Sequence, residues 1–246
     1  MPNMNYKGFE LDPFQEESIK AIDENKSVVV SAPTGSGKTL IADYIINRDF
    51  QKGIRVIYTA PIKALSNQKF REFSAEYGES NVGLMTGDVV KNPGAPILIM
   101  TTEIYRNMCL SDDELLKEIS YVIFDEIHYI NDIERGYVWE ESIIFSKPKV
   151  RMLCLSATIP NADEFARWIE AIKGHKVAVI RNEVRPVPLH TSFYDTVCGI
   201  STLNEIKELA DIPDYHYVHG RSKHRKPLIP APSHLDLIKE IKDKLP

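Results

Sequence analysis

The chain has 246 residues, of which 43% are hydrophobic and 26% charged, so it can bury a core, and a disordered or collagen-like chain is excluded. No run of 18 apolar residues and no apolar stretch behind a basic start occurs, so we expect a cytoplasmic protein without membrane span, signal peptide or membrane partner. The formal net charge of −5 excludes a uniformly basic nucleic-acid binder but leaves room for a local basic track. Three widely spaced cysteines, Cys109, Cys154 and Cys198, contain no CxxC pair and favour neither a disulfide framework nor a zinc site.

Short β-branched runs alternate with longer amphipathic stretches through most of the chain. Strands are predicted at residues 28–31, 55–59, 82–85, 97–101, 121–125, 152–156 and 177–180, and helices at 38–47, 64–77, 102–108, 113–118, 137–145 and 163–172. Asn161 and Glu164 have the spacing of a helix cap followed by an acidic residue. Most of the strands are apolar on both faces, as in a parallel sheet covered by helices. We therefore expect a doubly wound α/β domain that binds its ligands at the carboxyl ends of the strands.

The alternation of strands and helices stops near residue 185, and the composition changes after residue 194. Arg-Pro-Val-Pro at 185–188 predicts an extended segment, and a further strand is expected at 189–194. Beyond it we predict a short helix at 203–210, a basic run and an amphipathic helix at 233–245; the basic run consists of Arg221, Lys223, Arg225 and Lys226.

A glycine-rich loop follows the first predicted strand and leads into a helix. It is formed by Ala32, Pro33, Thr34, Gly35, Ser36, Gly37, Lys38 and Thr39. Small residues let backbone N–H groups surround phosphates, Lys38 would reach the β and γ phosphates of ATP, and Thr39 would bind Mg²⁺. The strict pattern begins with glycine rather than Ala32, and a plain glycine-rich turn is the competing interpretation.

Two carboxylates end the strand predicted at 121–125. Asp125 suits a Mg²⁺ ligand and Glu126 a group that positions the attacking water, because the carboxyl end of this strand lies beside the phosphate loop in a parallel sheet. A solvated acidic pair is the alternative. His128 is a further catalytic candidate that could instead bond to a strand-end hydroxyl and respond to the nucleotide state.

These motifs resemble the first RecA-like domain of a superfamily 2 helicase. APTGSGKT is similar to motif I, DEIH at 125–128 to motif II, and SAT at 156–158 to motif III. The longer runs FELDPFQEESI (9–19), PIKALSNQKF (61–70), FDEIHYINDIERGYVWEE (124–141) and RPVPL (185–189) resemble the superkiller-type, exosome-associated DExH-box RNA helicases. The resemblance covers residues 9 to 194 and implies a RecA-like P-loop domain with a mainly parallel sheet flanked by helices on both faces.

The resemblance also implies roles for further residues. Gln15 is similar to the glutamine that reads adenine, and Ser156 and Thr158 to a pair that couples the ATP and RNA sites. Residues 59–68 are similar to motif Ia, which would contact RNA phosphates through its backbone, including Pro61, and through Lys63. Thr101, Thr102 and Glu103 are similar to motif Ib, which would do so through hydroxyls and the N-terminal amides of a helix. Lys63 could equally be an ordinary surface lysine. For the group-specific residues Glu134, Arg135, Trp139 and Glu140 we favour packing around the acidic motif over direct chemistry.

The function implied is the ATP-binding part of a 3′ to 5′ RNA helicase, with ATP and Mg²⁺ as cofactors, single-stranded RNA as substrate and an RNA-degrading complex as a further partner. Residues 1–194 would form the RecA-like domain, and residues 195–246 a connector to a second RecA-like domain, whose arginine motif is absent from this sequence. We therefore expect little ATPase from this chain alone. A DNA-repair helicase of the related archaeal type and a nucleotide-dependent scaffold without unwinding remain as alternatives.

Overall fold

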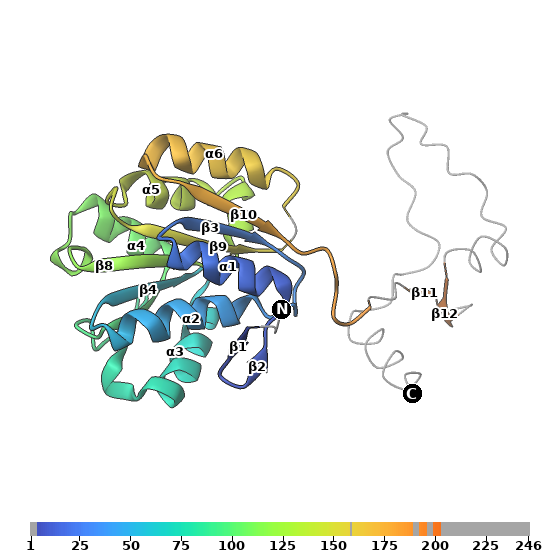
Figure 1. Cartoon of the computed structure of the whole chain (residues 1–246), viewed down its shortest axis with the longest axis horizontal. Coiled ribbons are helices and arrows are strands. Elements are labelled where there is room, and N and C mark those ends of the chain that lie inside the picture. The colour runs from blue at the N-terminus through green and yellow to red at the C-terminus, as the bar shows by residue number, and fades with distance from the viewer. Residues whose placement is uncertain (1–3, 158, 189–191, 196–198, 203–246) are drawn as a thin grey trace, which may run out of the picture. The chain divides into compact units, whose positions relative to one another are not determined.

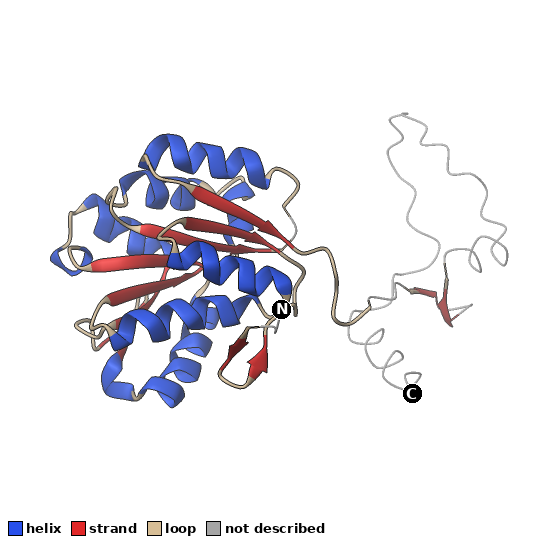
Figure 2. Cartoon of the chain, in the orientation of Figure 1, coloured by secondary structure: helices blue, strands red, loops and turns tan. Residues whose placement is uncertain are grey.

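The computed structural model of the chain describes residues 4–157, 159–188, 192–195 and 199–202. Two compact units divide the chain, Met1–Leu189 and His190–Pro246. In the first unit, an eight-stranded sheet lies between two layers of helices (Figures 1 and 2). This arrangement confirms the expected α/β class with helices on both faces of the sheet.

The sheet is parallel except at one edge. Its strands are β3 (Ser27–Ser31), β4 (Arg55–Ala60), β5 (Val82–Met85), β6 (Val90–Lys91), β7 (Ile97–Thr101), β8 (Ile119–Phe124), β9 (Arg151–Ser156) and β10 (Val177–Arg181). Their order is β10-β3-β9-β8-β4-β7-β5-β6, and only the β5–β6 pair is antiparallel. All seven strands predicted up to residue 180 are present. The central ones are buried throughout, which is why their sequences do not alternate.

Three helices cover each face. The helices α1 (Pro13–Asp23), α2 (Lys38–Gln51) and α3 (Lys63–Tyr77) pack on one side, and α4 (Thr102–Leu110), α5 (Tyr137–Phe145) and α6 (Ala162–Lys173) on the other. Each layer of helices forms a hydrophobic core with one face of the sheet, and successive strand residues belong to different cores. Val28 and Val30 face the first layer, and Val29 faces the second. A buried strand therefore contributes to two cores at once.

Several elements differ from expectation. Helix α1 and the hairpin of β1 (Asn5–Tyr6) and β2 (Phe9–Glu10) were not predicted, nor was β6. The helix predicted at 113–118 is wrong: the chain forms only a 3₁₀ turn at Glu114–Leu116, because Asp113 accepts a hydrogen bond from Leu115 N–H and β8 begins at Ile119. Helix α6 starts where Asn161 predicted, but the Asn161 side chain makes no capping bond.

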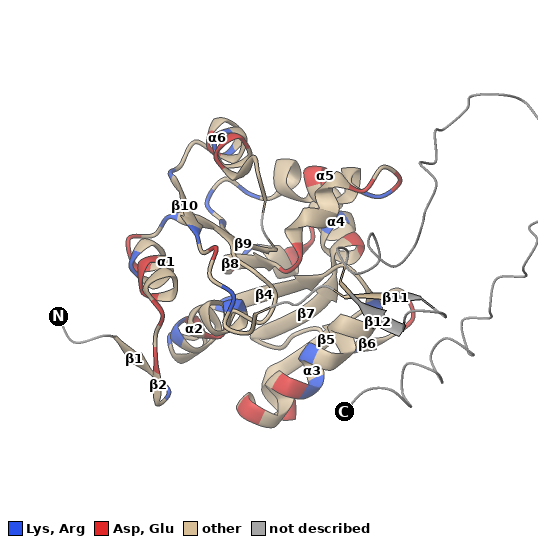
Figure 3. Cartoon of the chain, turned by 90° about the vertical axis from the view of Figure 1, so that its right-hand side faces the viewer, with Lys and Arg blue, Asp and Glu red and all other residues tan. Residues whose placement is uncertain are grey.

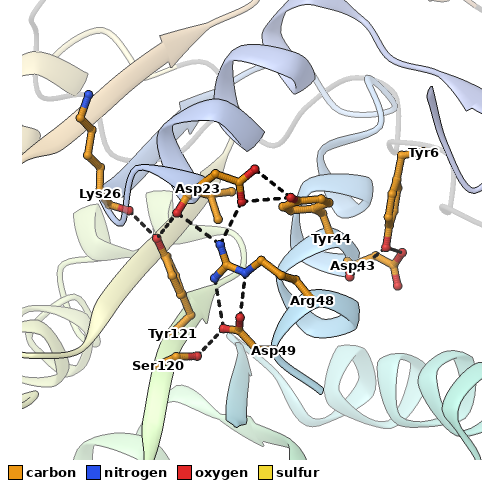
Figure 4. A network of polar contacts seen from close by, with 10 residues as sticks. Tyr6, Asp23, Lys26, Asp43, Tyr44, Arg48, Asp49, Ser120 and Tyr121 are labelled. Carbon is orange, nitrogen blue, oxygen red and sulfur yellow. Dashed lines mark hydrogen bonds and ion pairs between the residues drawn. The ribbon is translucent and has the colours of Figure 1, made fainter. Parts of the chain in front are cut away.

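A polar network fixes α2 at the amino edge of the sheet (Figure 4). Arg48 binds Asp49 at 2.7 Å and reaches Asp23 at the end of α1 at 3.3 Å. Asp49 is only 2% exposed and also accepts a hydrogen bond from the hydroxyl of Ser120 on β8. Buried carboxylates are stable when such partners satisfy them. This network anchors the end of α2 that lies opposite the phosphate loop.

In the second unit, β11 (Phe193–Asp195) and β12 (Gly199–Ser201) pair in antiparallel orientation. The strand expected at 189–194 overlaps β11, while residues 189–191 lie outside the described part. So do Thr158, Cys198, the basic run at 221–226 and the helices expected at 203–210 and 233–245. Among the described helices, none has both the length and the apolar character needed to cross a membrane.

Candidate functional site

The candidate site residues gather at one edge of the sheet. Because β3, β9, β8, β4 and β7 are parallel neighbours, the loops that follow them leave the sheet on the same side. Figure 3 views this edge, with α2 and its N-terminal loop on one side of the sheet and α4 and α5 on the other. The chain therefore brings the glycine-rich loop, the acidic motif and the two candidate RNA loops to a common surface.

The glycine-rich loop has the backbone of a phosphate cradle. Gly37 has a φ of 84°, and a Cβ at this position would lie 2.6 Å from Nε2 of Gln15, so only glycine fits. Helix α2 begins at Lys38, which directs its free N–H groups and positive dipole end toward the loop. The hydroxyl of Ser36 is buried and has no hydrogen-bond partner among the described residues. An anion in the cradle would satisfy it.

Ala32 departs from the glycine of the strict motif for a visible reason. Its side chain is fully buried in the core beside α2, and its φ is not positive. Its N–H continues the ladder with β9 by donating to the Ser156 carbonyl at 3.1 Å. The backbone at this position therefore does not require glycine.

Lys38 folds back over the loop. Its Nζ donates to the carbonyls of Ala32 and Pro33 at 2.7 and 2.9 Å. Burial lowers the pKa of Lys38, whereas the nearby charges of Glu126 and Asp125 act in the opposite direction. The phosphate-loop lysine and both acidic residues thus lie close enough for their charges to interact.

Gln15 lies under the loop rather than on the surface. Its side chain is 5% exposed; Nε2 donates to the Gly37 carbonyl at 3.0 Å, and Oε1 accepts from the Asp12 N–H at 2.9 Å. The amide thus fastens the start of α1 to the loop. One N–H of this amide takes no part in these two bonds.

The acidic motif follows β8 directly. Asp125 is half-buried; its N–H donates to the Thr59 carbonyl at 3.0 Å, and its Oδ1 accepts from the Glu126 N–H at 3.0 Å. Its Oδ2 accepts a hydrogen bond of 2.5 Å from the hydroxyl of Tyr58, a residue that the sequence did not suggest. Burial, followed by the charge of Asp125, raises the pKa of Tyr58 well above its usual range, so the phenol remains a donor.

Glu126 and His128 are paired. Glu126 adopts a left-handed conformation with a φ of 52°, and its Oε2 lies 3.2 Å from Nδ1 of His128. The same nitrogen is 3.5 Å from the Ser156 hydroxyl, a long contact with the strand-end hydroxyl considered in the sequence. The ring also packs against Tyr129, with centroids 5.2 Å apart. His128 thus lies between the acidic motif and the end of β9.

The candidate RNA loops are only partly open to solvent. Lys63 begins α3, is exposed and pairs with Asp88 at 2.5 Å. Pro61 and Thr101 are buried, and Thr102 is fully buried with its hydroxyl donating to the Ala60 carbonyl at 3.4 Å. Among the predicted contacts, Lys63 is the exposed cation that RNA phosphates could reach, whereas the half-buried Glu103 carboxylate pairs with Arg135 and would repel phosphate.

Arg135 joins these loops to the segment after the acidic motif. One guanidinium nitrogen donates to the Pro61 carbonyl at 2.9 Å and also binds the Glu103 carboxylate. Its Cζ lies 5.8 Å from the ring centroid of Trp139, which is fully buried. Packing around the acidic motif therefore extends to both candidate RNA loops.

The donor set also fits a magnesium nucleotide. Thr39 at the start of α2 and Asp125 after β8 offer a hydroxyl and a carboxylate, which are ligands suited to Mg²⁺. Lys38 and the orphaned Ser36 hydroxyl provide donors for phosphate oxygens.

Comparison with known proteins shows the family of the chain. The family model of the DEAD/DEAH box helicase matches residues 12–165. The chain belongs to the DEAD/DEAH box helicase family. It is 54% identical to the ATP-dependent RNA helicase mtr4 of Schizosaccharomyces pombe and 52% identical to the human Exosome RNA helicase MTR4, each over 181 residues. These alignments cover 74% of the chain but only 16% and 17% of the relatives, which confirms the likeness to exosome-associated helicases over a part of their length.

The fold of the chain is similar to that of a solved helicase structure. The Mycobacterium smegmatis helicase Lhr, determined with single-stranded DNA and AMP-PNP, superposes with a TM-score of 0.57 at 26% identity, over 74% of this chain and 26% of that one. The RecA-like fold class expected from the sequence is thereby confirmed.

Proposed function

We propose that this chain is the ATP-binding part of an ATP-dependent RNA helicase that acts in RNA processing or decay and moves 3′ to 5′. The observation that carries the proposal is the strand order, which places the phosphate loop after β3, the Asp125–Glu126 pair after β8 and the candidate RNA loops after β4 and β7 at one edge of the sheet. The names of the two relatives above, an ATP-dependent RNA helicase and an exosome RNA helicase, support the choice of RNA and of an RNA-degrading complex as partner.

In this proposal each residue of the site has one task. Lys38 and the loop N–H groups bind the β and γ phosphates, and Thr39 and Asp125 hold Mg²⁺, which would offset phosphate charge. Glu126 orients the attacking water and accepts its proton, while His128 and Ser156 respond to the bound nucleotide. Gln15 recognises the adenine, and motifs Ia and Ib bind RNA phosphates.

The chain spans less than a fifth of the curated relatives it matches, so the whole activity is assigned to a longer protein. We propose that residues 1–194 form the RecA-like domain and that residues 195–246 connect it to a second such domain. An arginine from that domain would contribute roughly 10³–10⁵ in rate, as in other phosphoryl-transfer enzymes.

The test measures ATP hydrolysis by the full-length protein and by residues 1–246, each with single-stranded RNA or DNA of matched sequence. We expect RNA to stimulate the full-length protein more than DNA does, Glu126→Gln to abolish turnover, and residues 1–246 to be nearly inactive. Stronger stimulation by DNA would favour a DNA-repair helicase. Nucleotide binding without hydrolysis in the full-length protein would favour a scaffold.

A further inference from the structure

Tyr58 occupies an unusual place for a hydroxyl-bearing side chain. It lies on the central strand β4, is 0% exposed and belongs to the core between the sheet and helices α1 to α3. A phenylalanine would fill the same volume without bringing a polar atom into this core. The buried hydroxyl of Tyr58 therefore needs a hydrogen-bond acceptor, and Asp125 provides it.

The strand register explains how the two side chains meet. Tyr58 lies opposite Ile123 on β8, and Asp125 is two residues further along that strand's direction. A tyrosine side chain is long enough to cover this step, and the T-shaped contact with Phe73, at 5.6 Å between ring centroids, holds the ring in place. The phenol thus approaches the carboxylate from a rigid part of the core.

Together with the Glu126 N–H, this contact fixes the whole carboxylate. Oδ2 accepts from Tyr58 at 2.5 Å and Oδ1 accepts from Glu126 at 3.0 Å, so rotation of the carboxyl group is restricted before any ligand arrives. Each oxygen keeps a further lone pair for a cation. Partners that orient a ligating carboxylate in this way commonly determine metal affinity.

We propose that Tyr58 is a positioning residue that sets the Asp125 carboxylate for Mg²⁺ and thereby determines how strongly Mg²⁺ promotes nucleotide binding. This inference rests on the proposed function, in which Asp125 holds the metal. It assigns Tyr58 no contact with nucleotide and no part in proton transfer. Its effect is confined to the metal-dependent part of the affinity.

The experiment titrates ADP into the 246-residue chain by calorimetry, once with MgCl₂ and once with EDTA. In Tyr58→Phe we expect the ratio of the two affinities to fall by about 10-fold, the lower end of the range for loss of such a partner, while affinity in EDTA stays unchanged. Tyr121→Phe is the matched control, because Tyr121 is 1% exposed on the neighbouring strand β8 and its hydroxyl binds the distant Lys26 carbonyl at 2.6 Å.

A double-mutant cycle with Asp125→Ala tests the route of the effect. If Tyr58 acts through Asp125, the change Tyr58→Phe has no further effect on the Mg²⁺ ratio when Asp125 is absent. An unchanged affinity ratio in Tyr58→Phe would overturn the proposal. So would a loss of ADP affinity that is equal in MgCl₂ and in EDTA, or a fall of the ratio that is equally large in the Asp125→Ala background. Failure of the wild-type chain to bind ADP under both conditions would instead refute the proposed function itself.

Discussion

The guanidinium of Arg135 donates a hydrogen bond of 2.9 Å to the main-chain carbonyl of Pro61, a residue 74 positions earlier in the chain. The same nitrogen binds Glu103, so one side chain connects the loops after β4 and β7. Because the side chains of Arg135 and Glu103 are each more than a third exposed, at 39% and 34%, their ion pair alone contributes little. The bond to the carbonyl is the stronger support of the loop.

Arg135→Ala is expected to lower the free energy of unfolding by about 1–2 kcal/mol, from the lost hydrogen bond and the contact with Trp139. Urea denaturation measures this change. Arg135→Lys should recover less than half, since lysine lacks the planar fork and its stacking on the indole. A loss of less than about 0.3 kcal/mol in Arg135→Ala would show that Arg135 does not support the loops.

Measurements of RNA affinity in variants distinguish the exposed from the buried candidate contacts. Lys63→Ala should reduce the slope of log affinity against log salt by about 0.7, the value for one phosphate contact on a single strand, whereas Thr102→Ala should not change it. Asp88→Ala should strengthen binding, because Asp88 pairs with Lys63 and competes with phosphate. Fluorescence anisotropy with single-stranded RNA provides these values.

The basic run at 221–226 is the rival RNA site. We prepare a quadruple variant with alanine at Arg221, Lys223, Arg225 and Lys226. In this variant we expect Lys63→Ala and Thr102→Ala to affect RNA binding as they do in the parent chain. If only this variant loses binding, the assignment of motifs Ia and Ib to RNA is wrong for this chain.

The fold was largely predictable because its strands are buried on both faces. A run such as Val28 to Val30 has no alternation, which favours a parallel sheet and hence the common edge for the loops. Residues 113–118 were mispredicted because local helical preference lost to the capping bond of Asp113 and to the early start of β8. Helix α1 was missed although its residues include Gln15.

Within the site, the motif residues were predictable and their partners were not. Tyr58 meets Asp125 across 67 residues, and only the strand register places them together. The hydroxyl of Tyr58, in a strand that is mostly apolar, was the feature of the sequence that could have indicated this contact. The burial of Gln15 and Thr102 likewise depends on packing that neither spacing nor composition reveals.

Lys173 provides a pH-dependent prediction. It is 6% exposed, its Nζ donates to the Ile144 carbonyl at 3.0 Å, and burial lowers its pKa to about 8. The unfolded chain holds this proton until about pH 10.4, so between these values the unfolded state binds more protons and the folded state gains stability as the pH rises. Below pH 8, both states are protonated and the contribution is constant.

We therefore expect the difference in unfolding free energy between the parent chain and Lys173→Met to shift in favour of the parent from pH 7.5 to 9.5. Urea titrations at several pH values measure it, with Cys109→Ala in both chains, because the charge of Lys173 also acts on the Cys109 thiol, whose pKa is raised by burial. A difference that is constant over this range would contradict the lowered pKa of Lys173.

The central claim is that Lys38 and its loop bind the phosphates of a magnesium nucleotide. Calorimetric titration of Mg²⁺–ADP into the 246-residue chain, its Lys38→Ala variant and a surface control, Lys20→Ala, tests it most directly. We predict weak binding at one site, because the proposed function assigns further nucleotide contacts to a second RecA-like domain. We also predict a loss of about 10- to 100-fold in Lys38→Ala from the missing charged hydrogen bonds, and no change in Lys20→Ala. Equal affinities of the parent chain and Lys38→Ala would contradict the account.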